Sequence, residues 1–347
     1  MTQTPRRPTI RLPRPGPETV TATPYNAETA LAAIGEPLTD PGAFFVRNHF
    51  DAPRMDPRDW RLRIDGAVLR PFTLTYSELR ALPSHALEVV LECAGNGRSL
   101  MKPTPPGVPW GLRAAGCTRF VGVTLRTVLG RAGVLSMARE VVFAGADGFE
   151  RSLTVRQATR PDVLLATHMG DGPLTRQHGA PVRLVVPGWY GVASVKWLVG
   201  VTAVTEPFRG HFQTSYVYRY PGVPGDVPTR RMRVRALITA PRDGAVLPRG
   251  PVTVAGHAWS GEAPIERVEV SLDGGATWSP AQLRPAPGWT DWSITMVATA
   301  VGVVRAVARA TDRRGNTQPW TAPWNAFGYG NNAIGAVEFT IGRGARR

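Results

Sequence analysis

One of the two cysteines in this 347-residue chain stands where chemistry is possible. Cys93 follows a short apolar run and begins a loop, residues 93–98, that holds two glycines and ends at Arg98. Glycine lets a bulky group approach the backbone, and a nearby arginine favours the reactive thiolate form of a cysteine. A lone cysteine is more often a small buried apolar side chain. That alternative stays open for Cys93 and is favoured for Cys117, which has no such neighbours.

A second candidate cluster is the run Arg47-Asn48-His49, which follows two phenylalanines and a valine. The run places three different hydrogen-bonding side chains in one aromatic loop. A solvated loop that is anchored by a buried phenylalanine explains the same pattern equally well, so the cluster alone does not decide between the two.

A third cluster lies at both ends of one predicted strand, residues 182–186. His178 and Arg183 lie at the start of this strand, and Ser194 and Lys196 follow its end. Lys196 is one of only two lysines in the chain. Such an arrangement can bind a phosphate together with a polar ring.

Composition narrows the class of protein. With 43% hydrophobic residues, 19% charged residues, 37 glycines and 33 prolines, the chain is expected to be ordered, rich in strands and turns, and poor in helices. Its length favours two domains. The net charge of +15 comes almost entirely from scattered arginines. A solvated basic surface that attracts anions explains this charge better than nucleic-acid binding, which needs clustered basic residues.

The sequence also argues against several other features. The two cysteines lack the spacing of a structural zinc site. The chain contains no apolar run of about 18 residues, so we expect no membrane span. Arg6-Arg7 is similar to the start of a twin-arginine export signal, but no apolar segment follows the pair. We therefore expect residues 1–23 to form a disordered tail and the protein to be cytoplasmic.

The first two thirds of the chain mix both kinds of element. Alternation predicts a strand at residues 60–64, and a capping box from Thr75 to Glu78 predicts a short helix that stops at residue 82. Further strands are expected at 88–91, 140–144 and 182–186, and helices at 27–34 and 125–133. We expect an α+β domain at residues 24–230.

The last third is predicted to be all β. Residues 252–255, 268–272 and 304–310 alternate apolar and polar positions, and Asp273-Gly274-Gly275 is a strong hairpin-turn signal. Several short strands at this spacing predict an immunoglobulin-like sandwich at residues 231–347.

Five motifs, in this order along the chain, resemble the sulfite oxidase family of molybdopterin enzymes, which includes the related domain of assimilatory nitrate reductases. They are Phe-Val-Arg47-Asn48-His49, Glu-Cys93-Ala-Gly-Asn-Gly-Arg98, Gly-Ala-Asp147, His178-Gly-Ala-Pro-Val-Arg183 and Ser194-Val-Lys196-Trp197. Residues 271–278 and Trp324-Asn325 with Gly328 are similar to the family's immunoglobulin-like dimerisation domain. The likeness spans residues 40–340.

The resemblance implies a role for each matching residue. Cys93 corresponds to the thiolate that binds molybdenum beside the pterin, a soft ligand suited to a redox metal. The residues implied to hold the pterin and its phosphate are Asn48, His49, Asp147, His178, Arg183, Ser194 and Lys196. Those implied to bind the oxyanion are Arg47, Arg98, Trp110 and Tyr216, with Tyr218 as the alternative to Tyr216.

The resemblance also implies the reaction. We expect a molybdenum–molybdopterin enzyme that oxidises sulfite to sulfate by oxygen-atom transfer at the metal. Its electrons would pass to a separate acceptor, such as a cytochrome, because we expect no haem in this chain. The second domain is expected to form a homodimer, and we expect neither a nucleic-acid partner nor a membrane.

One position departs from the family pattern. Sulfite oxidases of the family have an arginine two residues after the Trp-Asn pair, and this chain has Phe327 there. The change removes one positive charge from the implied anion site. Two alternatives therefore stay open: a molybdenum enzyme of the same fold that reduces nitrate or an S- or N-oxide, and a non-catalytic anion-binding protein on this scaffold.

Overall fold

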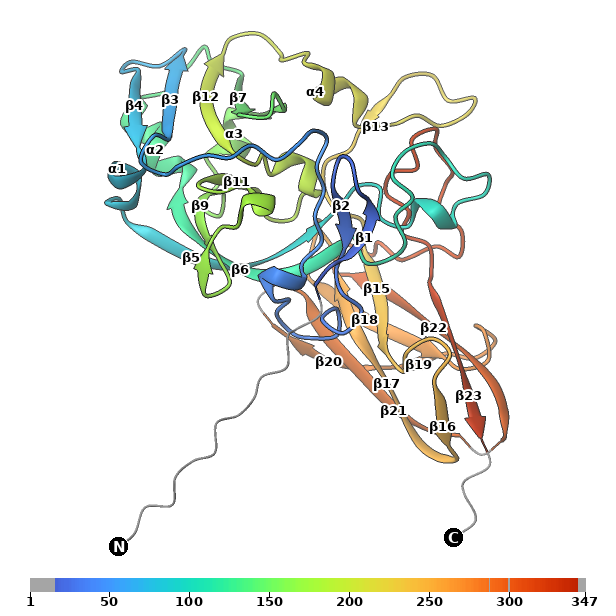
Figure 1. Cartoon of the computed structure of the whole chain (residues 1–347). Helices are drawn as coiled ribbons and strands as arrows, with labels where there is room; N and C mark the ends of the chain where they lie inside the picture. The colour runs from blue at the N-terminus through green and yellow to red at the C-terminus, as the bar shows by residue number, and fades with distance from the viewer. Residues whose placement is uncertain (1–15, 287, 299, 343–347) are drawn as a thin grey trace, which may run out of the picture.

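The computed structural model describes residues 16–342 except residues 287 and 299. Figure 1 shows a wide region that mixes sheets with short helices, joined to an elongated pair of sheets that contains strands β15 to β23. Strands predominate in both parts, as the composition predicted. Residues 1–15 of the expected tail and residues 343–347 of the expected second domain lie outside the described residues.

Two five-stranded sheets frame the first domain in the described part of the chain. One has the order β10-β9-β6-β5, with β11 paired to β9. The other has the order β4-β3-β12-β7-β8, in which β12 runs parallel to β3 and antiparallel to β7. The strands are β3 (Arg61–Gly66), β4 (Phe72–Thr75), β5 (Ser84–Glu92), β6 (Ala115–Thr124), β7 (Glu140–Gly145), β8 (Glu150–Thr154), β9 (Leu164–Met169), β10 (Gly172–Pro173), β11 (Arg183–Val185) and β12 (Leu198–Val204).

The main core of this domain unites apolar side chains from both sheets. In β3, Leu62 and Ile64 are buried while Arg61 and Arg63 are exposed, so the alternation predicted at residues 60–64 is confirmed. Side chains from β6, β7, β9, β11 and β12 join the same cluster. Burial of this apolar surface stabilises the packing of the two sheets and so fixes the positions of the loops that follow their strands.

Short helices close the edges of these sheets. α1 (Tyr76–Arg80) begins with the predicted capping box, in which the Thr75 side chain accepts from the Glu78 amide and the Glu78 carboxylate accepts from the Thr75 amide. α2 (Leu125–Ala132) ends at Gly133, whose φ of +68° suits glycine. Both helices were predicted. α3 (Val155–Ala158), α4 (His211–Ser215) and the 3₁₀ turns Pro41–Ala43, Arg98–Leu100, Arg176–His178 and Gly191–Ala193 complete the described helical elements.

Two expectations about the N-terminal region are wrong. Residues 27–34 do not form a helix, because Asn26–Glu28 is strand β2 and the following residues are turns. The tail expected over residues 1–23 contains strand β1 (Glu18–Thr21), which pairs with β2. Glu18 forms an ion pair with Arg113 at 2.6 Å, so contacts with distant residues outweigh the local composition.

The second domain consists of two sheets that share one core. The sheets have the orders β15-β17-β21-β20 and β16-β23-β22-β18-β19, and buried side chains from both form a single cluster. The strands predicted at residues 252–255, 268–272 and 304–310 correspond to β17, β18 and β22. The strands are β15 (Arg235–Ala240), β16 (Val246–Pro248), β17 (Gly250–Trp259), β18 (Ile265–Ser271), β19 (Ser279–Pro280), β20 (Gln282–Pro285), β21 (Thr290–Ala298), β22 (Gly302–Asp312) and β23 (Ala336–Gly342).

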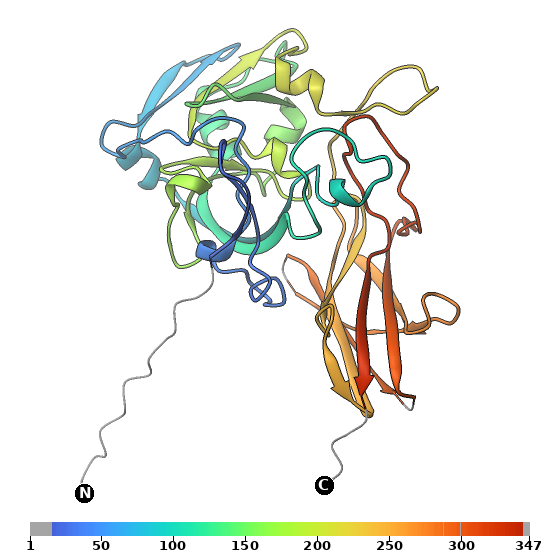
Figure 2. The same ribbon diagram turned by 45° about the vertical axis from the view of Figure 1, so that its right-hand side comes forward.

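The two domains are in close contact. The hairpin of β13 (Val217–Tyr218) and β14 (Val227–Pro228) leads from one to the other, and a buried apolar cluster contains residues of both. Figures 1 and 2 both place the loop near residue 100 beside the loop near residue 325. There the Trp324 indole N–H donates to the Pro103 carbonyl at 2.7 Å. Second-domain residues therefore lie beside the loop that contains Cys93 and Arg98.

Candidate active site

A cavity opens beside the end of β5. Its walls come from residues 44–49, the loop that follows β5, the turn that follows β7, and the segments before and after β11. All eight side chains that the sequence implied for cofactor binding line this cavity: Asn48, His49, Cys93, Asp147, His178, Arg183, Ser194 and Lys196.

Cys93 lines this cavity from the loop after β5. Its amide donates to the Ala114 carbonyl at 2.8 Å, and its carbonyl accepts from the Asn96 amide at 2.9 Å, which fixes the turn after β5. Burial raises the pKa of the Cys93 thiol, while the positive charges of Arg47 and Arg98 lower it. A metal that replaces the thiol proton would remove the cost of forming the thiolate in a buried position.

The segments around β11 form another wall of the cavity. The guanidinium of Arg183, which is 6% exposed, donates to the carbonyls of His178 and Ser194 at 3.1 Å each. The Ser194 hydroxyl accepts from the Val186 amide at 3.1 Å. These bonds join the two ends of the strand, so the third cluster of the sequence forms one compact wall.

This wall has an excess of basic groups. Lys196 donates to the Asn48 side-chain oxygen and, at 2.9 Å, to the Gln177 carbonyl. Burial and the charge of Arg183 hold the pKa of Lys196 well below its ordinary value. Burial likewise lowers the pKa of Arg183 to about 10. Asp147 is the nearby carboxyl group, and burial raises its pKa.

The two histidines of the cavity are neutral at ordinary pH. Burial lowers the pKa of His178 to about 3, and the charges of Arg183 and Lys196 act in the same direction. Burial, with the charges of Arg47, Lys196 and His211, lowers the pKa of His49 to about 2. Both imidazoles can therefore act as neutral hydrogen-bonding groups toward a polar ring.

The residues present fit a molybdenum–pterin group. Buried cations without ionised partners cost free energy, so the wall of Arg183 and Lys196 favours an anion such as a phosphate. Neutral imidazoles and the Asn48 amide suit the pterin ring. Cys93 supplies one soft ligand, and the described residues contain no group of three or more His, Cys, Asp or Glu side chains that could hold a metal ion. A metal at Cys93 therefore needs further ligands from a bound molecule.

A second cavity shares Cys93 with the first as a lining residue. All four side chains that the sequence implied for oxyanion binding line it: Arg47, Arg98, Trp110 and Tyr216. Arg47, Cys93 and Tyr216 line both cavities. A small anion in the second cavity would therefore lie beside whatever Cys93 binds in the first.

The second cavity is equipped for an anion. Arg98 is 6% exposed, and its guanidinium donates to the carbonyls of Phe327 at 3.0 Å and Val108 at 2.8 Å. It forms no ion pair with a carboxylate of the described residues. The indole N–H of Trp110 is buried and has no hydrogen-bond partner in that part of the chain. Two guanidinium groups suit a small oxyanion.

The structure separates the two tyrosine candidates. Tyr216 lines both cavities, and its hydroxyl lies 2.7 Å from His49 Nε2. Tyr218 lines neither and packs under the guanidinium of Arg233, 4.4 Å from its ring centre. The geometry thus places Tyr216, and not Tyr218, at the candidate site.

Phe327 lines the second cavity, where the family pattern expects an arginine. Its ring stacks on Tyr329, with ring centres 5.9 Å apart, and the guanidinium of Arg219 lies 5.1 Å from its ring centre. A cation is therefore present behind the phenylalanine, but it pairs with Asp226 at 2.6 Å. The Asp226 carboxylate therefore offsets most of the positive charge that Arg219 would contribute to the cavity.

Comparison with known proteins agrees with this geometry. Residues 49–212 match the model of the oxidoreductase molybdopterin binding domain, and residues 227–340 match that of the Mo-co oxidoreductase dimerisation domain. The sulfite oxidase of Gallus gallus is 38% identical over 318 residues, which cover 82% of this chain and 69% of that protein. This chain belongs to the sulfite oxidase family.

Two other similar proteins extend the comparison. The mitochondrial sulfite oxidase of Mus musculus is 36% identical over 301 residues, which cover 78% of this chain and 55% of that protein. The chain thus spans little more than half the length of that relative. The crystal structure of the sulfane dehydrogenase SoxCD from Paracoccus pantotrophus superimposes with a TM-score of 0.83 at 28% identity, covering 92% of this chain and 85% of the other. The chain is therefore a molybdopterin-dependent oxidoreductase.

The cavities also contain residues that the motifs did not single out. The Gln177 side chain accepts from the Asn48 amide at 2.8 Å, and Tyr329 lines the second cavity. Gln177 directly precedes His178, and Tyr329 lies two positions after Phe327. Closeness in sequence to a motif residue was the one signal by which the sequence could have identified these two residues.

Among the described residues, no helix has both the length and the apolar character needed to cross a membrane.

Proposed function

We propose that this enzyme oxidises sulfite to sulfate. The reaction is SO₃²⁻ + H₂O → SO₄²⁻ + 2H⁺ + 2e⁻, and a separate one-electron acceptor, such as a cytochrome, takes up the electrons in two steps. The observation that carries the proposal is that the side chains of Arg47 and Arg98, together with Trp110, line a cavity that shares Cys93 with the first. Sulfite is a small dianion, and paired guanidinium donors suit its oxygens.

In this proposal the first cavity holds the cofactor. Cys93 is the protein ligand of molybdenum, Lys196 and Arg183 bind the pterin phosphate, and Asn48 and His49 contact the ring. Asp147, His178 and Ser194 complete the site. When bound, the group supplies an exchangeable oxygen atom and accepts two electrons. The residues of this cavity contribute binding and orientation.

The residues of the second cavity position the substrate. Arg47 and Arg98 bind sulfite oxygens and offset the charge of the anion, which directs the sulfur lone pair toward Cys93. The Tyr216 hydroxyl and His49 Nε2 lie 2.7 Å apart and share a hydrogen bond, which fixes the position of the hydroxyl beside the place proposed for the oxyanion. Trp110 lines the same cavity.

The second domain supports a proposal about assembly. Since residues 227–340 match a dimerisation domain, we propose that the enzyme is a homodimer with a domain boundary near residues 230 and 231. Light scattering on the purified chain tests the dimer, and limited proteolysis tests the boundary.

Phe327 favours a second candidate function. With a neutral ring in place of an arginine, the pocket has one positive charge fewer and a larger apolar wall. That change suits a less charged substrate, such as nitrate or an S- or N-oxide. A sulfane is a further candidate of this kind, since SoxCD is a sulfane dehydrogenase. The cofactor cavity is the same under either function.

The test is a metal measurement combined with a substrate panel. The chain is produced in a host that makes the molybdenum cofactor, its molybdenum is measured per chain, and turnover is assayed with sulfite, thiosulfate, nitrate and dimethyl sulfoxide. The proposal expects close to one molybdenum per chain and the highest kcat/KM with sulfite. Metal-loaded protein that turns over another substrate but not sulfite supports the second candidate. Protein without metal supports a non-catalytic anion-binding role.

A further inference from the structure

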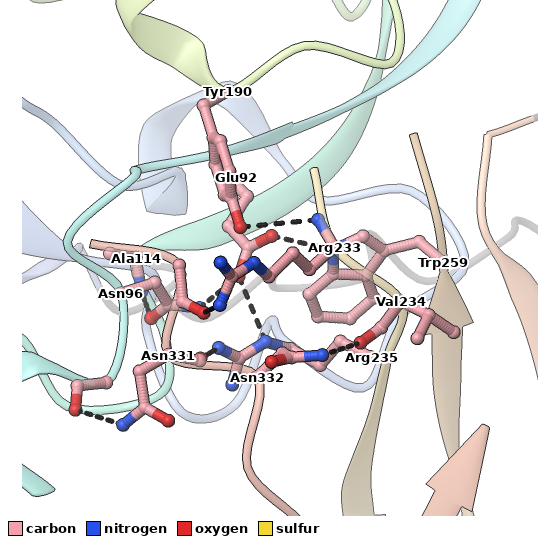
Figure 3. A network of polar contacts seen from close by, with 12 residues as sticks. Glu92, Asn96, Ala114, Tyr190, Arg233, Val234, Arg235, Trp259, Asn331 and Asn332 are labelled. Atoms are coloured by element: carbon pink, nitrogen blue, oxygen red, sulfur yellow. Dashed lines mark hydrogen bonds and ion pairs between the residues drawn. The ribbon is translucent and has the colours of Figure 1, made fainter. Parts of the chain in front are cut away.

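The residue before Cys93 faces the second domain. Glu92 ends β5, is 1% exposed, and its carboxylate lies among second-domain side chains in Figure 3. One oxygen accepts from the Asn96 side chain at 3.0 Å and pairs with the Arg235 guanidinium at 3.0 Å. The other oxygen accepts from the Trp259 indole N–H at 3.0 Å. Arg235 and Trp259 belong to β15 and β17, so this carboxylate joins the two domains.

The same arginine extends the connection to the loop after Cys93. Arg235 donates to the Asn331 carbonyl, and the Asn331 side chain donates to the Gly97 carbonyl at 2.7 Å. Gly97 has a φ of +82°, and a Cβ there would lie 3.1 Å from the Asn331 amide nitrogen. Glycine is therefore required at this contact.

Two further bonds fix the loop from the second domain. The Gly330 amide donates to the Ala94 carbonyl at 2.7 Å, and the Phe327 carbonyl accepts from the Arg98 guanidinium at 3.0 Å. Contacts with the second domain thus occur at residues 92, 94, 97 and 98. Both the cysteine and the arginine that this account places at the reaction centre belong to this short segment.

We propose that Glu92 and Arg235 are a positioning pair, which fixes residues 93–98 against the second domain and so sets the directions of the Cys93 and Arg98 side chains. The proposal rests on the role of Cys93 in the proposed function. Its physical basis is that a buried ion pair contributes little net stability compared with an apolar contact of the same size. Its best-supported use is to enforce one arrangement of the chain, and here that arrangement orients a metal ligand.

Two variants test the pair. Glu92→Gln keeps the shape of the side chain and removes its charge, and Arg235→Met removes the guanidinium together with its bond to the Asn331 carbonyl. The matched control is Arg309→Met, which breaks the ion pair of Arg309 with Glu269 at 2.9 Å elsewhere in the second domain. Arg235→Lys keeps the charge and serves as the conservative variant.

The first readout needs no cofactor. In the cofactor-free full chain, the alkylation rate of Cys93 is followed by mass spectrometry, with the fully buried Cys117 as internal reference. The proposal expects several-fold faster alkylation of Cys93 in Glu92→Gln and Arg235→Met, partial recovery in Arg235→Lys and the parent rate in Arg309→Met. Because no metal is involved, this result stands or falls separately from the proposed function.

The second readout is the electron paramagnetic resonance signal of Mo(V) in the loaded enzyme, recorded with kcat and KM. A displaced ligand should shift the signal and lower kcat by about 10-fold or more, since misplacement of about 1 Å can cost more than that. The proposal is overturned if Glu92→Gln and Arg235→Met lower only the unfolding temperature while alkylation, signal and kcat match the parent. If neither variant accumulates, Trp259→Phe, which removes one donor to Glu92, must show the same changes on a smaller scale, and parent values there overturn the proposal.

Discussion

The two cavities that share Cys93 differ in how they are built. The first, proposed for the cofactor, is lined by residues 44–216, all within the first domain. The second, proposed for the substrate, takes Phe327 and Tyr329 from the second domain. The cofactor site can therefore stay constant while loops of the second domain alter the substrate site. Phe327 is a change of this kind, because it modifies the second cavity and leaves the lining of the first unchanged.

The cavities also differ in their electrostatics. In the first, Lys196 and Arg183 hydrogen-bond to amide and carbonyl oxygens, and burial lowers the pKa of both. In the second, Arg98 is held by backbone carbonyls with Tyr329 stacked 5.2 Å from its guanidinium. Substitutions in the first cavity should therefore change cofactor content, and substitutions in the second should change kcat/KM at constant cofactor content.

The largest expected effect is on cofactor binding. Lys196→Met should weaken binding of the molybdenum–pterin group by about 100-fold, because a charged donor facing the phosphate is lost. The cofactor-free variant should unfold at the parent temperature or above it, since a poorly solvated cation is removed. Lys102→Met, at the exposed second lysine, is the matched control. Undiminished metal loading in Lys196→Met would contradict the assignment of the first cavity.

The next effect belongs to the second cavity. Arg98→Lys keeps the charge and removes the planar fork, so kcat/KM for sulfite should fall by about 10- to 100-fold, the value of one charge-assisted hydrogen bond. Steady-state kinetics with molybdenum measured per chain separates the two cavities. If the metal content falls in proportion to the activity, Arg98 contributes to cofactor binding, and the assignment of the second cavity to the substrate alone is wrong.

A smaller effect is expected from restoring the missing charge. Phe327→Arg should lower KM for sulfite by about 5-fold, in line with about 1 kcal/mol for a partly exposed ion pair. Phe327→Leu, which changes the wall without adding charge, should leave KM close to the parent value. If both variants give the same KM, Phe327 acts through the shape of the pocket, and the charge at this position does not affect sulfite binding.

The last effect is on stability and not on activity, and it concerns pH and only the first cavity. Because the pKa of His178 is about 3 in the folded protein, below its ordinary 6.5, the unfolded chain binds a proton that the folded chain does not. The free energy of unfolding should therefore fall as the pH drops below about 6.5, by ~1.4 kcal/mol per pH unit for this residue. Urea titrations of the cofactor-free chain at several pH values measure this slope, and His178→Gln should reduce it. An unaltered slope would mean that His178 is not held neutral.

The sequence predicted the first cavity well and the domain contact poorly, for a physical reason. Asn48, Cys93, His178 and Lys196 belong to short motifs whose residue types already indicate their chemistry, and all of them line one cavity. The pairing of Glu92 with Arg235 joins positions 143 residues apart in the sequence. No local pattern encodes such a contact.

The secondary structure likewise contains elements that the local sequence predicts and one segment that it does not. The strand at residues 60–64 and the capped helix after Thr75 depend on nearby residues, and the structure contains both. The helix expected at residues 27–34 fails because long-range bonds decide that segment. The Ala27 amide donates to the Val46 carbonyl at 2.9 Å, and the Thr29 hydroxyl donates to the Ala115 carbonyl at 2.6 Å.

The central claim is that Cys93 binds molybdenum, and the two cysteines allow a matched test. Cys93→Ser and Cys117→Ser are produced in a cofactor-competent host, and molybdenum content, the Mo(V) signal and sulfite turnover are measured for each. The account predicts that Cys93→Ser loses turnover and changes or loses the metal signal, while Cys117→Ser keeps both. Sulfite turnover at the parent rate with an unchanged metal signal in Cys93→Ser would contradict it.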